Sequence, residues 1–250
     1  MADDTDTRIS PTLHPGISDE IADYDEDTRP VLGQTETAVS EAFRALQSIH
    51  DAKAAAATNP TLNEFAQLIA VDNHAEKLMT KVYAKWSHTV DVLNNNIAAM
   101  EKDLYAPVES KASRTMATEI RQHFAHLEQG PRMNALRKAI EAGDETTATA
   151  VLGAPCYLSG LDPELHAEFL RDWHNAQRPV DAKKIRAMRA AADMLNERYK
   201  LLTTAHRDAV GVIEQTEEGR RGEKIVVRIW TPAQVRERVK AANEPFAVPV

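Results

Sequence analysis

Apolar residues recur every three or four positions along residues 61–105. The spacing from Leu68 to Leu104 averages 3.6 residues per step, which is the repeat of an α-helix, so one apolar stripe persists along the whole segment. A Thr61–Glu64 capping box is expected to start this helix. The stripe consists of Leu68, Val71, Ala75, Leu78, Val82, Trp86, Val90, Leu93, Ile97, Met100 and Leu104.

A second stripe follows in residues 181–218, with an average step of 3.5 residues. This is a heptad seam, typical of a helix that packs lengthwise on another helix. We therefore predict that the two long helices pair antiparallel and hold the main core. His206 lies in the seam, where it either fixes the register or acts as a pH switch. The residues expected to be buried in this pairing are Leu78, Val82, Leu93, Leu195, Tyr199 and Leu202.

Shorter helices are predicted around these two, and the residues between 153 and 161 are expected to form an apolar irregular loop. Asp162 before Pro163 is a strong helix-start signal. The predicted fold class is all-α: an elongated helical bundle with two long helices, an extended N-terminal arm and a small C-terminal β element. The shorter helices are expected at about 34–57, 109–129, 133–142, 144–152, 163–177 and 231–243.

One convincing strand is predicted, at 223–230, where Ile225, Val227 and Ile229 alternate with Lys224 and Arg228. Alternation of this kind is typical of a strand with one buried face. Since no other segment alternates well, its partner is expected to be a sheet edge on another subunit, or an extended stretch of the arm or tail. The expected organisation is an acidic arm (1–30), a helical bundle (31–218) and a basic strand–helix–tail docking segment (219–250).

Charge is distributed unevenly along the 250 residues, whose formal net charge is −8. Residues 1–29 hold nine acids and two bases, whereas 219–240 hold seven bases and two acids. The two ends are therefore expected either to attract each other, within or between subunits, or to be two solvated segments. The predicted interface residues are Ile225, Val227, Ile229, Arg220, Arg221, Asp23, Asp25, Glu26 and Asp27.

The acidic arm lacks the composition for a core of its own. Its four scattered aliphatic residues are expected to act as isolated anchors on a partner, so that the arm is disordered in the isolated subunit. These residues are Ile9, Leu13, Ile17 and Ile21.

Candidate catalytic chemistry is sparse. Glu119, His123 and His126 share a helix face, but no second helix with matching ligands is evident, so solvated or interfacial histidines are favoured over a metal site. A single cysteine excludes an internal disulfide, and Cys156 is expected to pack within its apolar loop. Phosphate-loop and nucleophile-elbow motifs are lacking. We therefore predict a protein that is not an enzyme, with no catalytic residue, cofactor or metal.

Nucleic-acid binding is an alternative, because Lys183, Lys184, Arg186 and Arg189 cluster near the start of the second long helix. The net negative charge does not favour it, since a DNA-binding protein needs a basic footprint. The N-terminus lacks a signal-peptide pattern and no apolar stretch is long enough to cross a bilayer. A location in a virion or in the host cytoplasm is expected, with no membrane partner.

The stretch Val151–Leu161, with the following Asp-Pro-Glu-Leu and Arg178–Pro179, resembles segments of uncharacterised helical proteins encoded by tailed phages and prophages. The resemblance covers about residues 151–179 and carries no functional residue. It implies a virion component near the capsid or portal, which fits a structural subunit of a multi-chain assembly. The expected partners are further copies of the chain or other structural proteins. The alternative is a cytoplasmic helical regulator or a nucleic-acid-associated factor.

Overall fold

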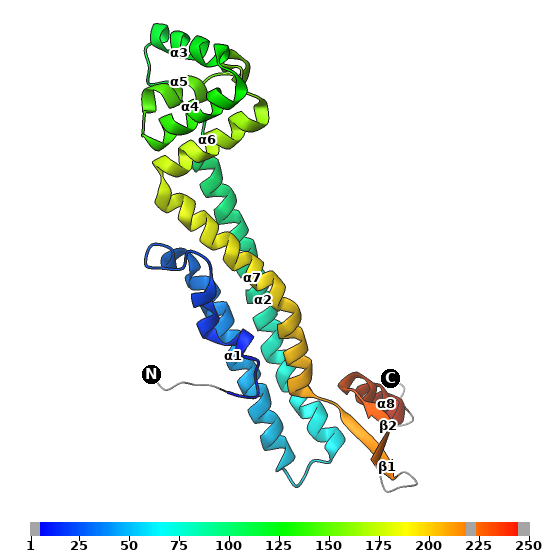
Figure 1. The fold of residues 1–250 in the computed structure, drawn as a ribbon. Coiled ribbons are helices and arrows are strands. Elements are labelled where there is room, and N and C mark those ends of the chain that lie inside the picture. Colours follow the sequence, from blue (N-terminus) through cyan, green and yellow to red (C-terminus); the bar gives the residue numbers. More distant parts are fainter. Residues whose placement is uncertain (1–5, 219–223, 245–250) are drawn as a thin grey trace, which may run out of the picture. The chain divides into compact units, whose positions relative to one another are not determined.

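A computed structural model describes residues 6–218 and 224–244 (Figure 1). These described residues are all-α apart from one small antiparallel sheet near the C-terminus, as predicted. The two longest helices have 41 and 32 residues. The α-helices are α1 (Arg29–Ala57), α2 (Glu64–Leu104), α3 (Arg114–His126), α4 (Gln129–Glu141), α5 (Glu145–Leu152), α6 (Pro163–Gln177), α7 (Pro179–Val210) and α8 (Pro232–Asn243); the 3₁₀-helices are η1 (Pro11–Leu13), η2 (Pro15–Glu20) and η3 (Cys156–Ser159); the strands are β1 (Ile213–Glu218) and β2 (Lys224–Trp230).

The chain divides into two compact units, each made of segments that are distant in sequence. Unit 1 comprises Met1–Tyr24, Leu32–Val92 and Ala190–Val250, and unit 2 comprises Asp25–Val31 and Leu93–Arg189. Both α2 and α7 contribute residues to each unit, because their apolar stripes run along their whole length.

The long helices pair antiparallel, as predicted. In unit 1, the Trp86 indole N–H donates to the carbonyl oxygen of Leu195 at 3.0 Å. In the same unit, the Tyr83 hydroxyl bonds Nδ1 of His206 at 2.9 Å. The partner in α7 therefore lies nearer the start of α7 as α2 advances from Tyr83 to Trp86, which defines the antiparallel direction.

Burial along the pair follows the predicted stripe with two corrections. Val82, Leu93, Leu195 and Leu202 are buried, with exposed fractions of 7% or less. Leu78 is only half-buried, because the adjacent Met79 takes the core position.

Tyr199, which was also expected in the core, is 45% exposed. Its ring instead packs edge-on against Tyr83 at 5.7 Å. A straight helix drifts by about 20° per heptad relative to a 3.5-residue seam, which carries some seam positions out of the core.

Several predicted helix boundaries were wrong, since α1 begins at Arg29 and α4 at Gln129, before the expected 34 and 133. Three further errors have local reasons. Helix α2 begins after Asn63, whose side chain accepts from the Ala66 N–H at 2.8 Å, so Thr61 is not the cap. Helix α3 begins late, at Arg114, because the Ser113 hydroxyl caps it. Helix α7 ends at Val210 because Gly211 has φ +81°, a left-handed conformation that terminates helices.

Residues 6–28, expected to be an extended arm that orders on a partner, lie on their own chain. Four aliphatic side chains of this segment are 2–5% exposed. The His14 ring contacts Phe43 of α1 at 5.2 Å, and the Arg8 guanidinium lies 2.8 Å from the Asp51 carboxylate. The four buried anchors are Ile9, Leu13, Ile17 and Ile21.

Unit 2 contains a separate core formed by the four short helices α3 to α6 (Figure 1). Its largest buried side chains include Phe124, Phe169 and Trp173. Arg132 of α4 holds the end of α3 by donating to the carbonyl oxygens of Phe124 at 2.8 Å and Leu127 at 2.5 Å. These carbonyls lie at the C-terminus of α3, where helix carbonyls lose their regular donors, although the Phe124 oxygen also accepts the Leu127 N–H at 3.2 Å.

Candidate interaction site

The strand at the C-terminus is paired within its own chain. Strand β2 pairs antiparallel with β1, so the prediction that its partner is a sheet edge on another subunit, or an extended stretch of the arm or tail, is wrong. The paired segment, Ile-Glu-Gln-Thr-Glu-Glu, lacks apolar alternation and was expected to continue the preceding helix. Gln215 opposes Arg228 and Thr216 opposes Val226, which leaves Val227 as a β-bulge.

This hairpin exposes a group of large apolar side chains. Val226, Val227 and Ile229 have exposed fractions of 46%, 51% and 50%. Val227 and Ile229 are two of the predicted interface residues, whereas Val226 was not among them because strict alternation places it on the opposite face of the strand. Of Ile225, only the backbone in β2 lies within the described structure. Val227 and Ile229 of the predicted interface are thus accessible, not buried in the chain's own core.

The base of the hairpin is fixed to helix α2 of the same unit. The Trp230 ring contacts Phe65 of α2 edge-on at 5.6 Å, and the Arg228 guanidinium stacks 4.4 Å from the Trp230 ring centre. Thr231 forms a capping box with Gln234, as expected from the sequence, and starts α8.

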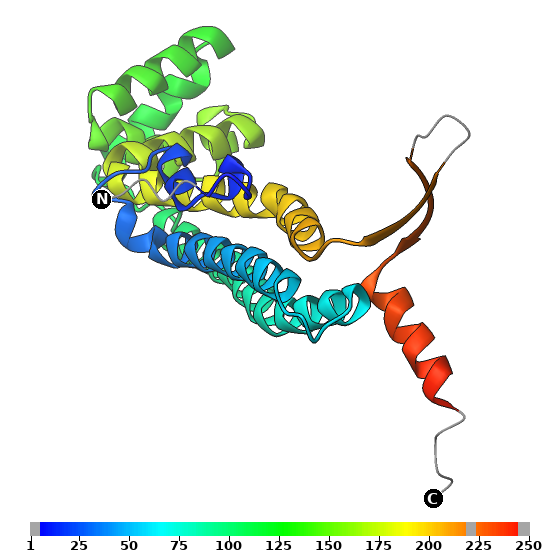
Figure 2. The same cartoon turned by 90° about the horizontal axis from the view of Figure 1, so that it is seen from below.

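The first turns of α8 are held in place, whereas its end is not buried. Val235 is 3% exposed, and Arg236 pairs with the Asp72 carboxylate of α2. This ion pair raises the pKa of the Arg236 guanidinium. Every residue from Glu237 to Asn243 is exposed, including Val239 at 51%. We call β1, β2 and α8 together the C-terminal module (Figure 2).

A groove of about 320 Å³ runs between β2 and α8. The side of α8 that lines it carries residues at helical spacings of three and four, which place them on one face. Basic side chains outnumber acidic ones two to one along this groove. Its lining residues are Arg228, Ile229, Trp230, Gln234, Glu237, Arg238 and Ala241.

The predicted acidic interface residues lie elsewhere. Asp25 and Asp27 both pair with Lys183 of α7, and the bond from Lys183 lowers the pKa of the Asp25 carboxyl group. Glu26 is exposed, and Asp23 adopts a left-handed φ of 62°.

The described residues therefore bring Asp25 and Asp27 to the start of α7, not to the C-terminal module. Arg220 and Arg221 lie outside the described residues. The basic cluster considered for nucleic acid is partly neutralised by the same contacts, since Lys183 pairs with these acids and Arg189 pairs with Glu101.

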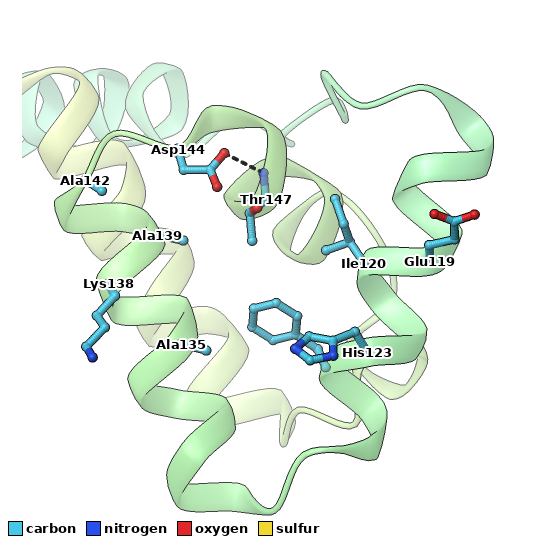
Figure 3. A pocket seen from close by; sticks show the side chains of 10 residues that line it. Glu119, Ile120, His123, Ala135, Lys138, Ala139, Ala142, Asp144 and Thr147 are labelled. Atoms are coloured by element: carbon cyan, nitrogen blue, oxygen red, sulfur yellow. Dashed lines mark hydrogen bonds between the residues drawn. The ribbon is translucent and has the colours of Figure 1, made fainter.

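A second cavity, of about 590 Å³, lies between α3, α4 and α5 in unit 2 (Figure 3). His123 points from α3 toward α4, whereas Lys138 points outward. Asp144 accepts the Thr147 N–H at 3.0 Å, and hydrogen bonding with Thr147 lowers the pKa of its carboxyl group. This carboxylate is thus used to cap α5.

The predicted histidine cluster gains no further ligand from the fold. Glu119 and His123 both line the cavity of unit 2, but His126 instead bonds the Gln122 carbonyl through Nδ1 at 2.6 Å. Within residues 6–218 and 224–244, no three His, Cys, Asp or Glu side chains are arranged to hold a metal ion. Cys156 packs against the unit 2 core, as expected.

His206, the polar residue of the heptad seam, bonds the Tyr83 hydroxyl through Nδ1 at 2.9 Å. Burial lowers the pKa of this imidazole, because removing it from water disfavours the charged form. The same desolvation raises the pKa of Tyr83 to about 12.

Comparisons with protein-family models, with curated proteins and with solved structures give no match to this chain. In the part of the chain that the structure describes, none of the helices combines the length and the apolar character that a membrane span requires.

Proposed function

We propose that this protein is a structural subunit of a multi-chain assembly and that its C-terminal module is the docking element. The observation that carries this proposal is the half-exposure of Val226, Val227 and Ile229 on a two-stranded sheet. Two-stranded ribbons are marginally stable in water, and exposed apolar clusters typically mark interaction sites. A partner that covers these side chains stabilises the ribbon and completes the module.

The charges and the bulge at the edges of the hairpin favour docking through the faces of the sheet. Strand β1 carries Glu214, Glu217 and Glu218 along its length, and β2 is interrupted by the bulge at Val227. Charged and bulged edges discourage the addition of unrelated strands. Specific docking is therefore expected through side chains, without uncontrolled edge-to-edge association.

The proposed assembly is a tailed-phage particle, near the capsid or portal. This part of the proposal is supported by the resemblance of residues 151–179 to proteins encoded by tailed phages and prophages. Within that segment, Tyr157 and Leu158 of η3 are 74% and 43% exposed, although their neighbours pack into the unit 2 core. An exposed aromatic on a short rigid turn offers a second contact point for a neighbouring protein.

The alternative, a nucleic-acid-associated regulator, has less support. Lys183 and Arg189, which belong to the basic cluster that suggested it, pair with carboxylates of the same chain. A phosphate backbone would have to displace these carboxylates before it could bind there.

The test is incorporation into the assembly when the protein is produced together with the structural proteins encoded beside it. Val227→Asp and Ile229→Asp each place a charge on the docking surface and should reduce the incorporated fraction at least tenfold. The matched control is Leu201→Asp, which alters an equally exposed side chain of α7, at 46%. Equal incorporation of all three variants would contradict the proposal, and salt-sensitive retention on DNA would favour the alternative.

A further inference from the structure

The two strands of the hairpin carry opposite charge. Strand β1 contains three glutamates and no base, whereas β2 contains Lys224 and Arg228 and no acid. Glu214 and Glu217 are exposed, so their carboxylates are available to a neighbouring molecule. The same module thus presents an acidic strand beside a basic one.

The basic side extends from β2 to α8. Arg228 and Arg238 line the groove between them, with Ile229 and Ala241 as apolar lining. The guanidinium of Arg228 is already held against the Trp230 ring, so little conformational entropy is lost when it meets a carboxylate. The groove fits a segment that is extended and acidic.

We propose that the occupant of this groove is strand β1 of a second copy of the chain. Strand β1 of each copy then lies along the groove of the other, around a twofold axis. Glu214 and Glu217 project from opposite faces of the strand, so the carboxylate on the face toward the groove meets Arg228 and Arg238. A twofold contact requires a surface that is complementary to itself, and adjacent acidic and basic elements on one module satisfy that requirement. The contact also covers Ile229. This inference rests on the proposed docking role of the C-terminal module and names its partner.

The size of the module sets the strength of this contact. Six residues of strand extend about 20 Å, and two strands beside a helix are about 20 Å wide, which gives roughly 400 Å² per copy. Stable complexes usually bury about 800 Å² per partner. The dimer of isolated chains is therefore weak, with a dissociation constant in roughly the micromolar to millimolar range, and it weakens as salt screens the charges. In an assembly, multivalency strengthens such a contact.

The experiment is a charge swap followed by sedimentation of the full chain over a wide concentration series at low salt. The first variant is Arg228→Glu with Arg238→Glu, and the second is Glu214→Arg with Glu217→Arg. Each variant alone places like charges opposite each other, so the self-dissociation constant should rise at least tenfold. An equimolar mixture restores both sets of opposite charges and should recover association near the original strength.

The matched control is Lys77→Glu with Lys81→Glu on exposed positions of α2, which changes the net charge as much as the first variant does. It should leave self-association within about twofold. Far-ultraviolet circular dichroism and hydrogen exchange of the hairpin check that each variant is folded. Should the Arg228 variant unfold the hairpin, the glutamate variant still tests the contact through loss of self-association.

A monomer at every concentration, or a mixture that does not recover, would overturn the inference. Neither result would contradict the proposed function, because the incorporation assay with Val227→Asp measures binding to other structural proteins and not self-association. The opposite outcome is also distinguishable. If the mixture of charge-swapped variants recovers self-association but Val227→Asp is incorporated normally, the dimer is supported and the docking role is contradicted.

Discussion

Replacing Arg132 with methionine should selectively destabilise unit 2. Methionine keeps most of the aliphatic stem but removes the guanidinium, which donates to the carbonyl oxygens of Phe124, Leu127 and Gly160. Hydrogen bonds from charged donors contribute about 1.5–3 kcal/mol each, and half-buried carbonyls recover part of this from water. Two well-formed bonds at 2.8 and 2.5 Å therefore correspond to a loss of about 3 kcal/mol.

Hydrogen exchange followed by mass spectrometry can assign this loss to one part of the chain. Amides of α3 and α4 in Arg132→Met should exchange faster by about two orders of magnitude, whereas those of α1 should be unchanged. Arg171→Met is the matched control, because Arg171 is an exposed residue of the same unit. Equal exchange in the two variants would refute the assignment of Arg132 as the residue that holds the end of α3.

Three further outcomes are expected. Leu195→Ala, at a fully buried position of α7, should lower the free energy of unfolding by about 2–5 kcal/mol in urea denaturation, and an unchanged midpoint would contradict the pairing of α2 with α7. Gly211→Ala should cost about 1–2 kcal/mol because φ is +81° there, and a stabilised protein would show that helix α7 need not end at Val210. Burial lowers the pKa of His206 below its ordinary value of 6.5, so the folded state binds fewer protons than the unfolded state and stability should fall as pH drops below about 6.5. His206→Gln should reduce that slope, and a slope identical to that of the original protein would exclude His206 as its source.

Periodicity predicted the long helices and their antiparallel pairing, because an apolar stripe sustained over many turns must be buried along its whole length, and a second long helix can cover it. It could not predict where the four aliphatics from Ile9 to Ile21 would be buried. That burial depends on contacts with Phe43 and its neighbours in α1, which are distant in sequence. Composition alone therefore indicated a segment that cannot form its own core. In the structure, helix α1 of the same chain supplies the apolar surface that buries it.

The exposed apolar side chains of the hairpin were predicted in part. Alternation identified Val227 and Ile229, and both are exposed on β2. The in-chain partner β1 was missed because its polar sequence carries no apolar alternation, although Gly211 marked the end of the preceding helix. Once Gly211 ends α7, the following residues can form a strand, and the register places Glu218 opposite Lys224, a pair of opposite charges that was an available signal.

Hydrogen exchange of the β2 amides, compared between the isolated chain and the assembled complex, tests the central claim most directly. A marginal ribbon opens often, so amides of residues 224–230 should exchange quickly in the isolated chain and at least tenfold more slowly once a partner covers Val227 and Ile229. The amides of α2 should change little. Equal exchange of 224–230 in both states would contradict the account, because it would mean that the exposed apolar side chains of the hairpin are not where this protein docks.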